Sequence, residues 1–172
     1  MATPPAARLI DQSIRCIFAL LVTAIFLGWQ PGAAALGDRP AAEAPSPQEE
    51  LVIEGSGRRH LFSVEVARDE AAHERGLMYR RHLALDHGML FDFGRPRPAA
   101  MWMRNTYIPL DILFIDGAGR ITKIHPQAQP HDETPIESNG RVRAVLELPG
   151  GTSERLGLKV GDRIRHPLFP VR

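Results

Sequence analysis

Cysteine is scarce in this sequence: Cys16 is the only one among 172 residues, and it lies near the N-terminus. Because the segment around Cys16 has the composition of a removable leader, the remaining chain is expected to contain no cysteine. Such a chain must fold by burial alone, without disulfides. Thiol catalysis and cysteine–metal sites are also excluded.

An excess of charge of either sign is also missing. Basic residues number 21 and acidic residues 20, and 24% of the chain is charged against 44% hydrophobic. This balance is typical of a folded domain rather than a disordered chain. It argues against a nucleic-acid partner, because such partners are held chiefly by clustered basic side chains.

Familiar catalytic signatures are missing as well. No serine occupies a nucleophile elbow, no phosphate-binding loop is present, and no internal repeat is found. These absences favour a binding or accessory role over catalysis.

No apolar run is long enough for a stable membrane span. The longest covers residues 16–29, which rise only about 21 Å as a helix, against the roughly 30 Å hydrocarbon core of a bilayer. Arg8 and Arg15 precede this run, and the small residues 33–35 follow it. The pattern predicts a signal peptide over residues 1–35 and export to the periplasm or the extracellular space. The alternative is a retained membrane anchor through residues 16–29, the one case in which a membrane partner is expected.

Beyond the signal, composition divides the chain into a linker and one domain. Residues 36–50 contain three prolines and little to bury, which predicts a solvated linker. Residues 51–172 are expected to form a single domain.

Within this domain, short alternating runs predict a mainly β fold. Strands are expected over 51–54, 60–67, 88–93, 100–105, 110–116, 120–125, 142–148 and 163–165. A hairpin is expected at 55–57, a helix over 70–75 between Asp69 and Gly76, a helical turn near 153–156 and an exposed loop over 126–139. Seven or eight short strands with one or two short helices indicate a compact small β-barrel or sandwich.

The densest set of polar side chains lies between residues 101 and 111. Strands on both sides of 105–109 would bring Trp102, Arg104, Asn105 and Asp111 to one end of a hairpin or strand corner. Asp111 interrupts an apolar strand, and a buried carboxylate is costly without partners. We therefore expect Asp111 to bond Arg104, Asn105 or backbone amides, either as a structural bond or as part of a polar ligand pocket.

Glu147 repeats this pattern, as a polar residue inside the apolar run 144–148. An isolated glutamate on a strand ordinarily lies on the solvated face. If Glu147 instead converged with Asp111, the two carboxylates would form a catalytic pair with separated pKa values. A binding pocket that includes Glu147 is the first hypothesis, and a small hydrolase using Asp111 and Glu147 is the alternative.

Arginines are concentrated near the same region. Guanidinium groups beside Trp102 would suit a carboxylate or a phosphate, and the alternative is a solvated arginine-rich loop. The five arginines are Arg80, Arg81, Arg95, Arg97 and Arg104, against Asp86 and Asp92.

Metal and cofactor sites are not expected. His73 and Glu74 open like a zinc-protease helix, but Leu77 stands where the second histidine is required. Methionines that suit Cu(I) more often fill a core; this set is Met78, Met89, Met101 and Met103, with His87. A glycine pair at 150–151 before a short helix would suit an anion, but it usually marks a turn.

Several motifs occur together in a characteristic order. They are ERGLMYR at 74–80, GMLF at 88–91, MWMRNT at 101–106, IPLDILF at 108–114, AVLELPGG at 144–151 and GD at 161–162. Over about residues 51–168 the chain resembles the domain-of-unknown-function family numbered 192, the uncharacterised ACR proteins. The resemblance implies a compact, mostly β and often exported domain, and it implies no activity, so the partner expected is an unidentified small molecule or protein.

Overall fold

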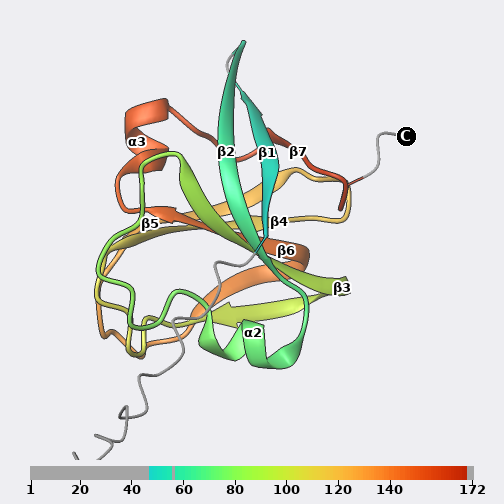
Figure 1. Cartoon of the computed structure of the whole chain (residues 1–172). Helices are drawn as coiled ribbons and strands as arrows, with labels where there is room; N and C mark the ends of the chain where they lie inside the picture. Colours follow the sequence, from blue (N-terminus) through green and yellow to red (C-terminus); the bar gives the residue numbers. More distant parts are fainter. Residues whose placement is uncertain (1–46, 56, 170–172) are drawn as a thin grey trace, which may run out of the picture. The chain divides into compact units, whose positions relative to one another are not determined.

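The protein is described by a computed structural model, which covers residues 47–55 and 57–169. The predicted signal peptide and nearly all of the predicted linker lie outside these residues. The described part is mostly β, as predicted, with seven strands and two short helices (Figure 1). In chain order these are β1 (Gln48–Gly55), β2 (Arg58–Ala67), α2 (Glu70–Arg75), β3 (His87–Met101), β4 (Leu110–Ile115), β5 (Ile121–Ala128), β6 (Ile136–Pro149), α3 (Thr152–Leu156) and β7 (Arg163–Arg165).

The strands form one curled sheet, a half-barrel, in the order β5-β4-β6-β3-β2-β1-β7. Neighbouring strands run antiparallel except β2 and β3, which are parallel. The two edges approach each other, because Ile121 N donates to Asp162 O (2.9 Å) and Ile164 N donates to Gly119 O (2.7 Å). The curl therefore separates an inner face of the sheet from an outer face.

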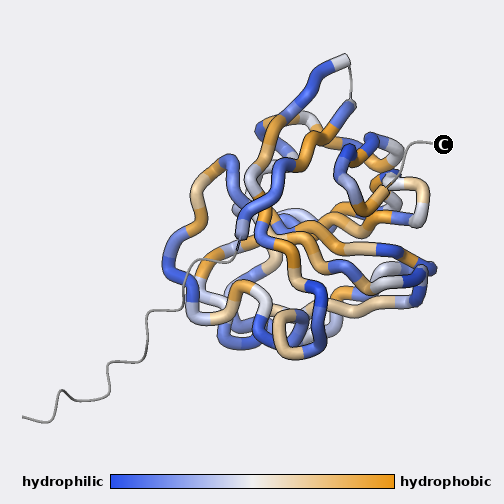
Figure 2. Tube along the Cα trace, turned by 45° about the vertical axis from the view of Figure 1, so that its right-hand side comes forward, coloured by the Kyte–Doolittle hydropathy of each residue, from blue (hydrophilic) through white to orange (hydrophobic). Residues whose placement is uncertain are grey.

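Each face carries its own hydrophobic core. The first core fills the inside of the curl and takes side chains from all seven strands, from Leu51 on β1 to Ile164 on β7. The second lies on the outer face of β3, β4 and β6, under α2 and the loops that follow α2 and β3. Figure 2 shows hydrophobic residues concentrated along these central strands. Because side chains alternate along a strand, successive residues of β4 and β6 enter different cores.

Local signals in the first half of the domain are confirmed. The chain turns between β1 and β2 as expected, and α2 begins after Asp69, whose Oδ1 accepts from Ala72 N at 2.8 Å. Gly76 ends the helix with a φ of 49°, a conformation that glycine adopts without strain. β1 begins at Gln48, within the segment predicted as linker.

The expected hairpin around residues 105–109 is wrong. Separate strands were expected over 88–93 and 100–105, but β3 continues through residues 94–99 with a register shift between Asp92 and Arg97. Residues 102–109 form a loop, and β3 and β4 do not pair because β6 lies between them. The loop now borders the outer core, where it shapes the candidate site.

The predicted loop over 126–139 is shorter than expected. β5 runs to Ala128 through Pro126, and β6 begins at Ile136, so the connection covers 129–135. Pro126 is tolerated because β5 is an edge strand, where a missing N–H costs no ladder bond on the open side. No helix in the described ranges has the length and apolar character needed to cross a bilayer.

Candidate functional site

Asp111 is buried and fully bonded, but to backbone groups distant in sequence. Its Oδ1 accepts from Gln127 N (2.8 Å) and Gly151 N (2.9 Å), and its Oδ2 accepts from both the backbone N and the Oγ of Ser153 (2.6 Å each). Arg104 and Asn105, the other predicted partners, do not contact it. Asp111 is therefore buried and hydrogen-bonded as expected, and of the expected partners it is the backbone amides that bond it.

These bonds give Asp111 a structural role. The N-cap residue of α3 is Gly151, which has no side chain to cap the helix, and the Asp111 carboxylate on β4 accepts the N–H bonds there instead. The anion bound next to the glycine pair at 150–151 is therefore the carboxylate of Asp111. Asp111 also fixes the end of β5 through Gln127, a residue with a φ of 49°.

Glu147 lies on the opposite face of the sheet from Asp111. Asp111 pairs with Leu148, a residue of the inner core, whereas Glu147 pairs with Ile112 on one side and Met89 on the other, both in the outer core. The two carboxylates thus point away from each other across the sheet. The structure does not bring together the carboxylate pair that the hydrolase alternative requires.

Glu147 is not on a solvated face, which corrects the ordinary interpretation of an isolated strand glutamate. The residue is 4% exposed, between Met89 and Ile112. Among the described residues, none forms a hydrogen bond or ion pair with its carboxyl group. Burial therefore raises the pKa of Glu147 to about 8. At neutral pH Glu147 is mainly a neutral acid that can donate a hydrogen bond.

Glu147 lines a cavity of about 430 Å³ on the outer face of the sheet. Its walls are α2 with the turn after it, the second half of β3, and the loop after β3. The lining residues include Leu77, Met78, Phe91, Phe93, Met101 and Thr106. This volume lies within the range of small-molecule sites, and the lining combines apolar side chains with polar and charged ones.

Trp102 and Arg104 line the same cavity, as predicted for a polar pocket. Trp102 is 43% exposed, and the Arg104 guanidinium carbon lies 4.4 Å from the centroid of its ring. Arg104 Nε is buried, and no acceptor in the described part of the chain bonds it. A buried charged donor without a partner is costly, which makes Arg104 a candidate ligand contact.

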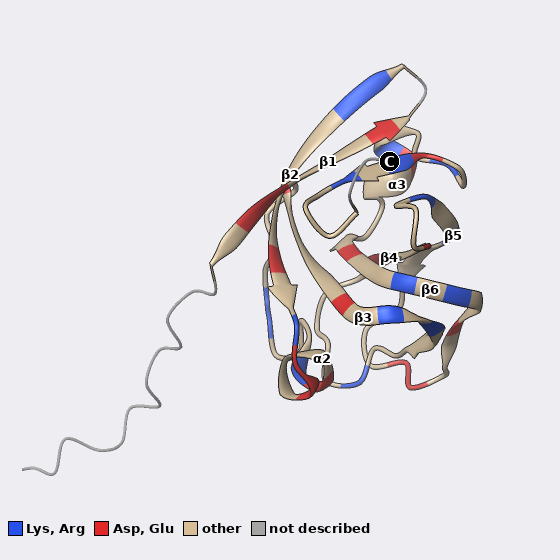
Figure 3. Ribbon diagram, turned by 90° about the vertical axis from the view of Figure 1, so that its right-hand side faces the viewer, with Lys and Arg blue, Asp and Glu red and all other residues tan. Residues whose placement is uncertain are grey.

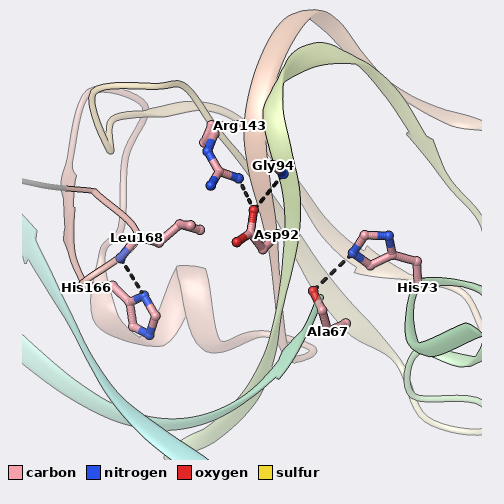
Figure 4. Close-up of polar contacts among 7 residues, drawn as sticks. All are labelled: Ala67, His73, Asp92, Gly94, Arg143, His166 and Leu168. Atoms are coloured by element: carbon pink, nitrogen blue, oxygen red, sulfur yellow. Dashed lines mark hydrogen bonds and ion pairs between the residues drawn. The ribbon is translucent and has the colours of Figure 1, made fainter. Parts of the chain in front are cut away.

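Arg97, one of the five arginines noted in the sequence, and His73, which was not expected at this site, also line the cavity. The Arg97 guanidinium lies 4.5 Å from the Phe93 ring centroid. His73 Nε2 donates to Ala67 O at 3.0 Å, because a carbonyl oxygen only accepts. Figure 4 shows His73 on one side of β3 and the Asp92–Arg143 ion pair on the other.

Asn105 lies outside the cavity, which corrects its place in the predicted pocket. The side-chain Nδ2 of Asn105 donates to Tyr79 Oη (3.0 Å), and the backbone carbonyl of Asn105 accepts from Tyr79 N (2.8 Å). Asn105 and Tyr79 both have positive φ angles, 55° and 64°. Asn105 therefore shapes the loop after β3, and the pocket retains Trp102, Arg104 and Glu147 of the predicted set.

The remaining arginines and the methionines have separate environments. Arg80 forms a two-pronged ion pair with Glu65, and Arg81 stacks over Tyr107. Acidic and basic side chains occur together along β3 and β6 (Figure 3). Met89 and Met103 are buried in the outer core, as expected of methionines that fill gaps. In the described ranges, no cluster of three or more His, Cys, Asp and Glu side chains suits a metal ion.

Comparison with known proteins identifies the family. A structure from Sinorhizobium meliloti, described as a putative transcription regulator, is 52% identical, with a TM-score of 0.70 and coverage of 72% of this chain and 96% of that one. A protein of unknown function from Novosphingobium aromaticivorans is 42% identical, with a TM-score of 0.68 and coverage of 69% and 85%. Curated proteins give no match. The family profile described as DUF192, uncharacterized ACR, matches residues 51–166, so this chain belongs to the DUF192 family.

Proposed function

We propose that this protein is an exported small-molecule-binding domain whose ligand occupies the cavity over Glu147. The observation that carries the proposal is Glu147, a residue only 4% exposed, which lines a cavity of about 430 Å³. A buried polar group is normally hydrogen-bonded, because leaving it unbonded costs free energy that folding does not return. A ligand that bonds Glu147 would remove this cost.

A second buried group supports the same interpretation. Arg104 Nε has no described acceptor, and Arg104, on the loop after β3, lines the same cavity. A buried donor without an acceptor and the carboxyl group of Glu147 in one cavity, beside apolar side chains, match the composition of binding sites. The hydrolase alternative is not proposed, because Asp111 is saturated by backbone donors and faces the inner core.

Filling the cavity should abolish ligand binding while leaving the fold intact. Ala99 lines the cavity at the outer core, so Ala99→Phe should occupy the ligand's space. The full chain is screened by thermal shift against sugars, nucleotides, organic acids and their amides; a ligand at 100 times its Kd stabilises the native state by about 2.7 kcal/mol. In Ala99→Phe this stabilisation should fall at least threefold.

Ala118→Phe, in the exposed turn between β4 and β5, is the matched control and should bind normally. Trp102→Ala, which removes a wall without filling space, is the second variant if Ala99→Phe folds poorly. Full ligand stabilisation in both cavity variants, or no stabilising compound in the screen, would contradict the proposed function.

Export rests on residues 1–35, which lie outside the described part. The mature protein should be recovered outside the cytoplasm with an N-terminus at or near Leu36, and Leu21→Arg, which breaks the apolar run, should block its export. N-terminal sequencing of fractionated cells measures this, with Ala42→Arg in the predicted linker as control. Soluble cytoplasmic protein that begins at Met1 would show that export is wrong.

A further inference from the structure

We infer that the ligand of this cavity is a small carboxylate with an apolar body, whose charged group is held by Arg104. This inference rests on the proposed function and narrows it to one chemical class. It comes from the placement of the polar and apolar groups around the cavity rather than from the cavity's size.

The orientation of Arg104 favours a carboxylate. Its guanidinium stacks on Trp102, and its buried Nε is the donor that lacks an acceptor among the described residues. Nε and a neighbouring Nη form one edge of the guanidinium, and two parallel N–H bonds along such an edge match the two oxygens of a carboxylate. Stacking on Trp102 restricts the guanidinium plane, so the fork is already oriented before a ligand binds.

A second cation supports an anionic ligand. Arg97 also lines the cavity, stacked on Phe93, and can contribute to the local positive potential. Glu70, Glu74 and Arg75 line the part contributed by α2, and Leu77, Phe91 and Met101 form an apolar part of the wall. A fully charged or highly hydroxylated ligand would lose its hydration against these side chains without replacement bonds, whereas an aromatic or aliphatic acid would not.

Glu147 accommodates this anion as long as it is protonated. Its nearest cross-strand neighbours, Met89 on β3 and Ile112 on β4, carry no charge. Other titratable or charged groups that line the cavity are Glu70, His73, Glu74 and Arg75 from α2 and its end, Arg97 from β3, and Arg104 from the loop. A protonated Glu147 adds no negative charge to this set, but an ionised one would repel a bound carboxylate in a site of low dielectric.

Matched carboxylate and amide probes test the inference. Isothermal titration of the full chain with phenylacetate and octanoate, and with phenylacetamide and octanamide, compares ligands that differ only in the charged group. Each carboxylate should bind at least tenfold more tightly than its amide. Arg104→Gln should weaken carboxylate binding at least tenfold and amide binding less than twofold. The carboxylate affinity of Arg104→Lys should lie between those of Arg104→Gln and the unmodified chain. Arg81→Gln, which removes an arginine stacked on Tyr107 outside the cavity, is the control.

The pH profile gives an independent readout. Carboxylate affinity should fall at least fivefold between pH 7 and pH 9.5, and Glu147→Gln should flatten this profile. Equal affinity for acids and amides, tighter binding of inorganic phosphate than of the carboxylates, or an unaltered profile in Glu147→Gln would overturn the inference. If neutral compounds bind and Ala99→Phe abolishes their binding, the proposed function still holds. If no compound binds, the proposed function itself is contradicted.

Discussion

Replacing Asp111 by alanine should lower the free energy of unfolding by about 3 kcal/mol, because the change removes the acceptor of four hydrogen bonds from three residues, and both Ser153 donors are buried. The affected groups belong to β5 and to the start of α3, so both elements lose their attachment to β4. Urea denaturation monitored by circular dichroism measures the loss, and Asp111→Asn should also be destabilising because its amide N–H would face these donors.

Asp116→Ala provides the matched control. Asp116 also accepts two backbone N–H bonds, from Ala118 (2.8 Å) and Arg120 (2.9 Å), but at an exposed turn. There water replaces the lost acceptor, and the cost should be under about 1 kcal/mol. Equal losses in Asp111→Ala and Asp116→Ala would show that burial of the Asp111 bonds contributes nothing to stability.

Glu147→Gln should gain stability over the unmodified chain as the pH rises. In the unfolded chain Glu147 ionises near its ordinary pKa of 4.5, whereas in the fold burial raises the pKa to about 8. Below pH 4.5 both states are protonated, and Glu147 imposes no pH-dependent cost. Between pH 4.5 and pH 8 the unfolded state binds fewer protons than the native state, so stability falls as pH rises, and above pH 8 the fall ends.

The size of this effect follows from the interval between the two pKa values. At 1.36 kcal/mol for each pKa unit, the loss accumulated by pH 8 is on the order of 4 kcal/mol. Denaturation at pH 4.5, 6, 7 and 8.5 should show the difference between Glu147→Gln and the unmodified chain growing along this series. Glu137→Gln, at an exposed position of the same strand, should show no such growth. A pH-independent difference for Glu147→Gln would mean that Glu147 ionises normally.

The alternation of side chains predicted Asp111 well and Glu147 poorly. Asp111 shares a face with Leu113 and Ile115, so its burial followed from the sequence, as did its need for partners. The identity of those partners did not follow, because Gly151 and Ser153 lie 40 or more positions away and reach Asp111 only through the curl of the sheet.

Glu147 was misplaced because a strand pattern does not say whether its second face is covered. The six-residue helix α2 and the loop after β3 shield the outer face of β6, and neither length nor composition of these segments indicates that packing. Similarly, Trp102 and Arg104 were assigned to a pocket through a hairpin that does not form. They reach the cavity from a loop that ends at β4, while Asn105, their neighbour in sequence, turns to Tyr79.

The side-chain Nε–H signal of Arg104 shows directly whether this arginine binds a carboxylate ligand. In ¹H–¹⁵N spectra of the full chain at pH 7, addition of phenylacetate should move this signal downfield and saturably, because a buried donor without a described acceptor gains a charged one. The Nε–H signal of Arg81 should stay in place. We expect a saturable downfield shift of the Arg104 signal. An Arg104 signal that does not move at a saturating concentration of phenylacetate would show that Arg104 does not bind the carboxylate.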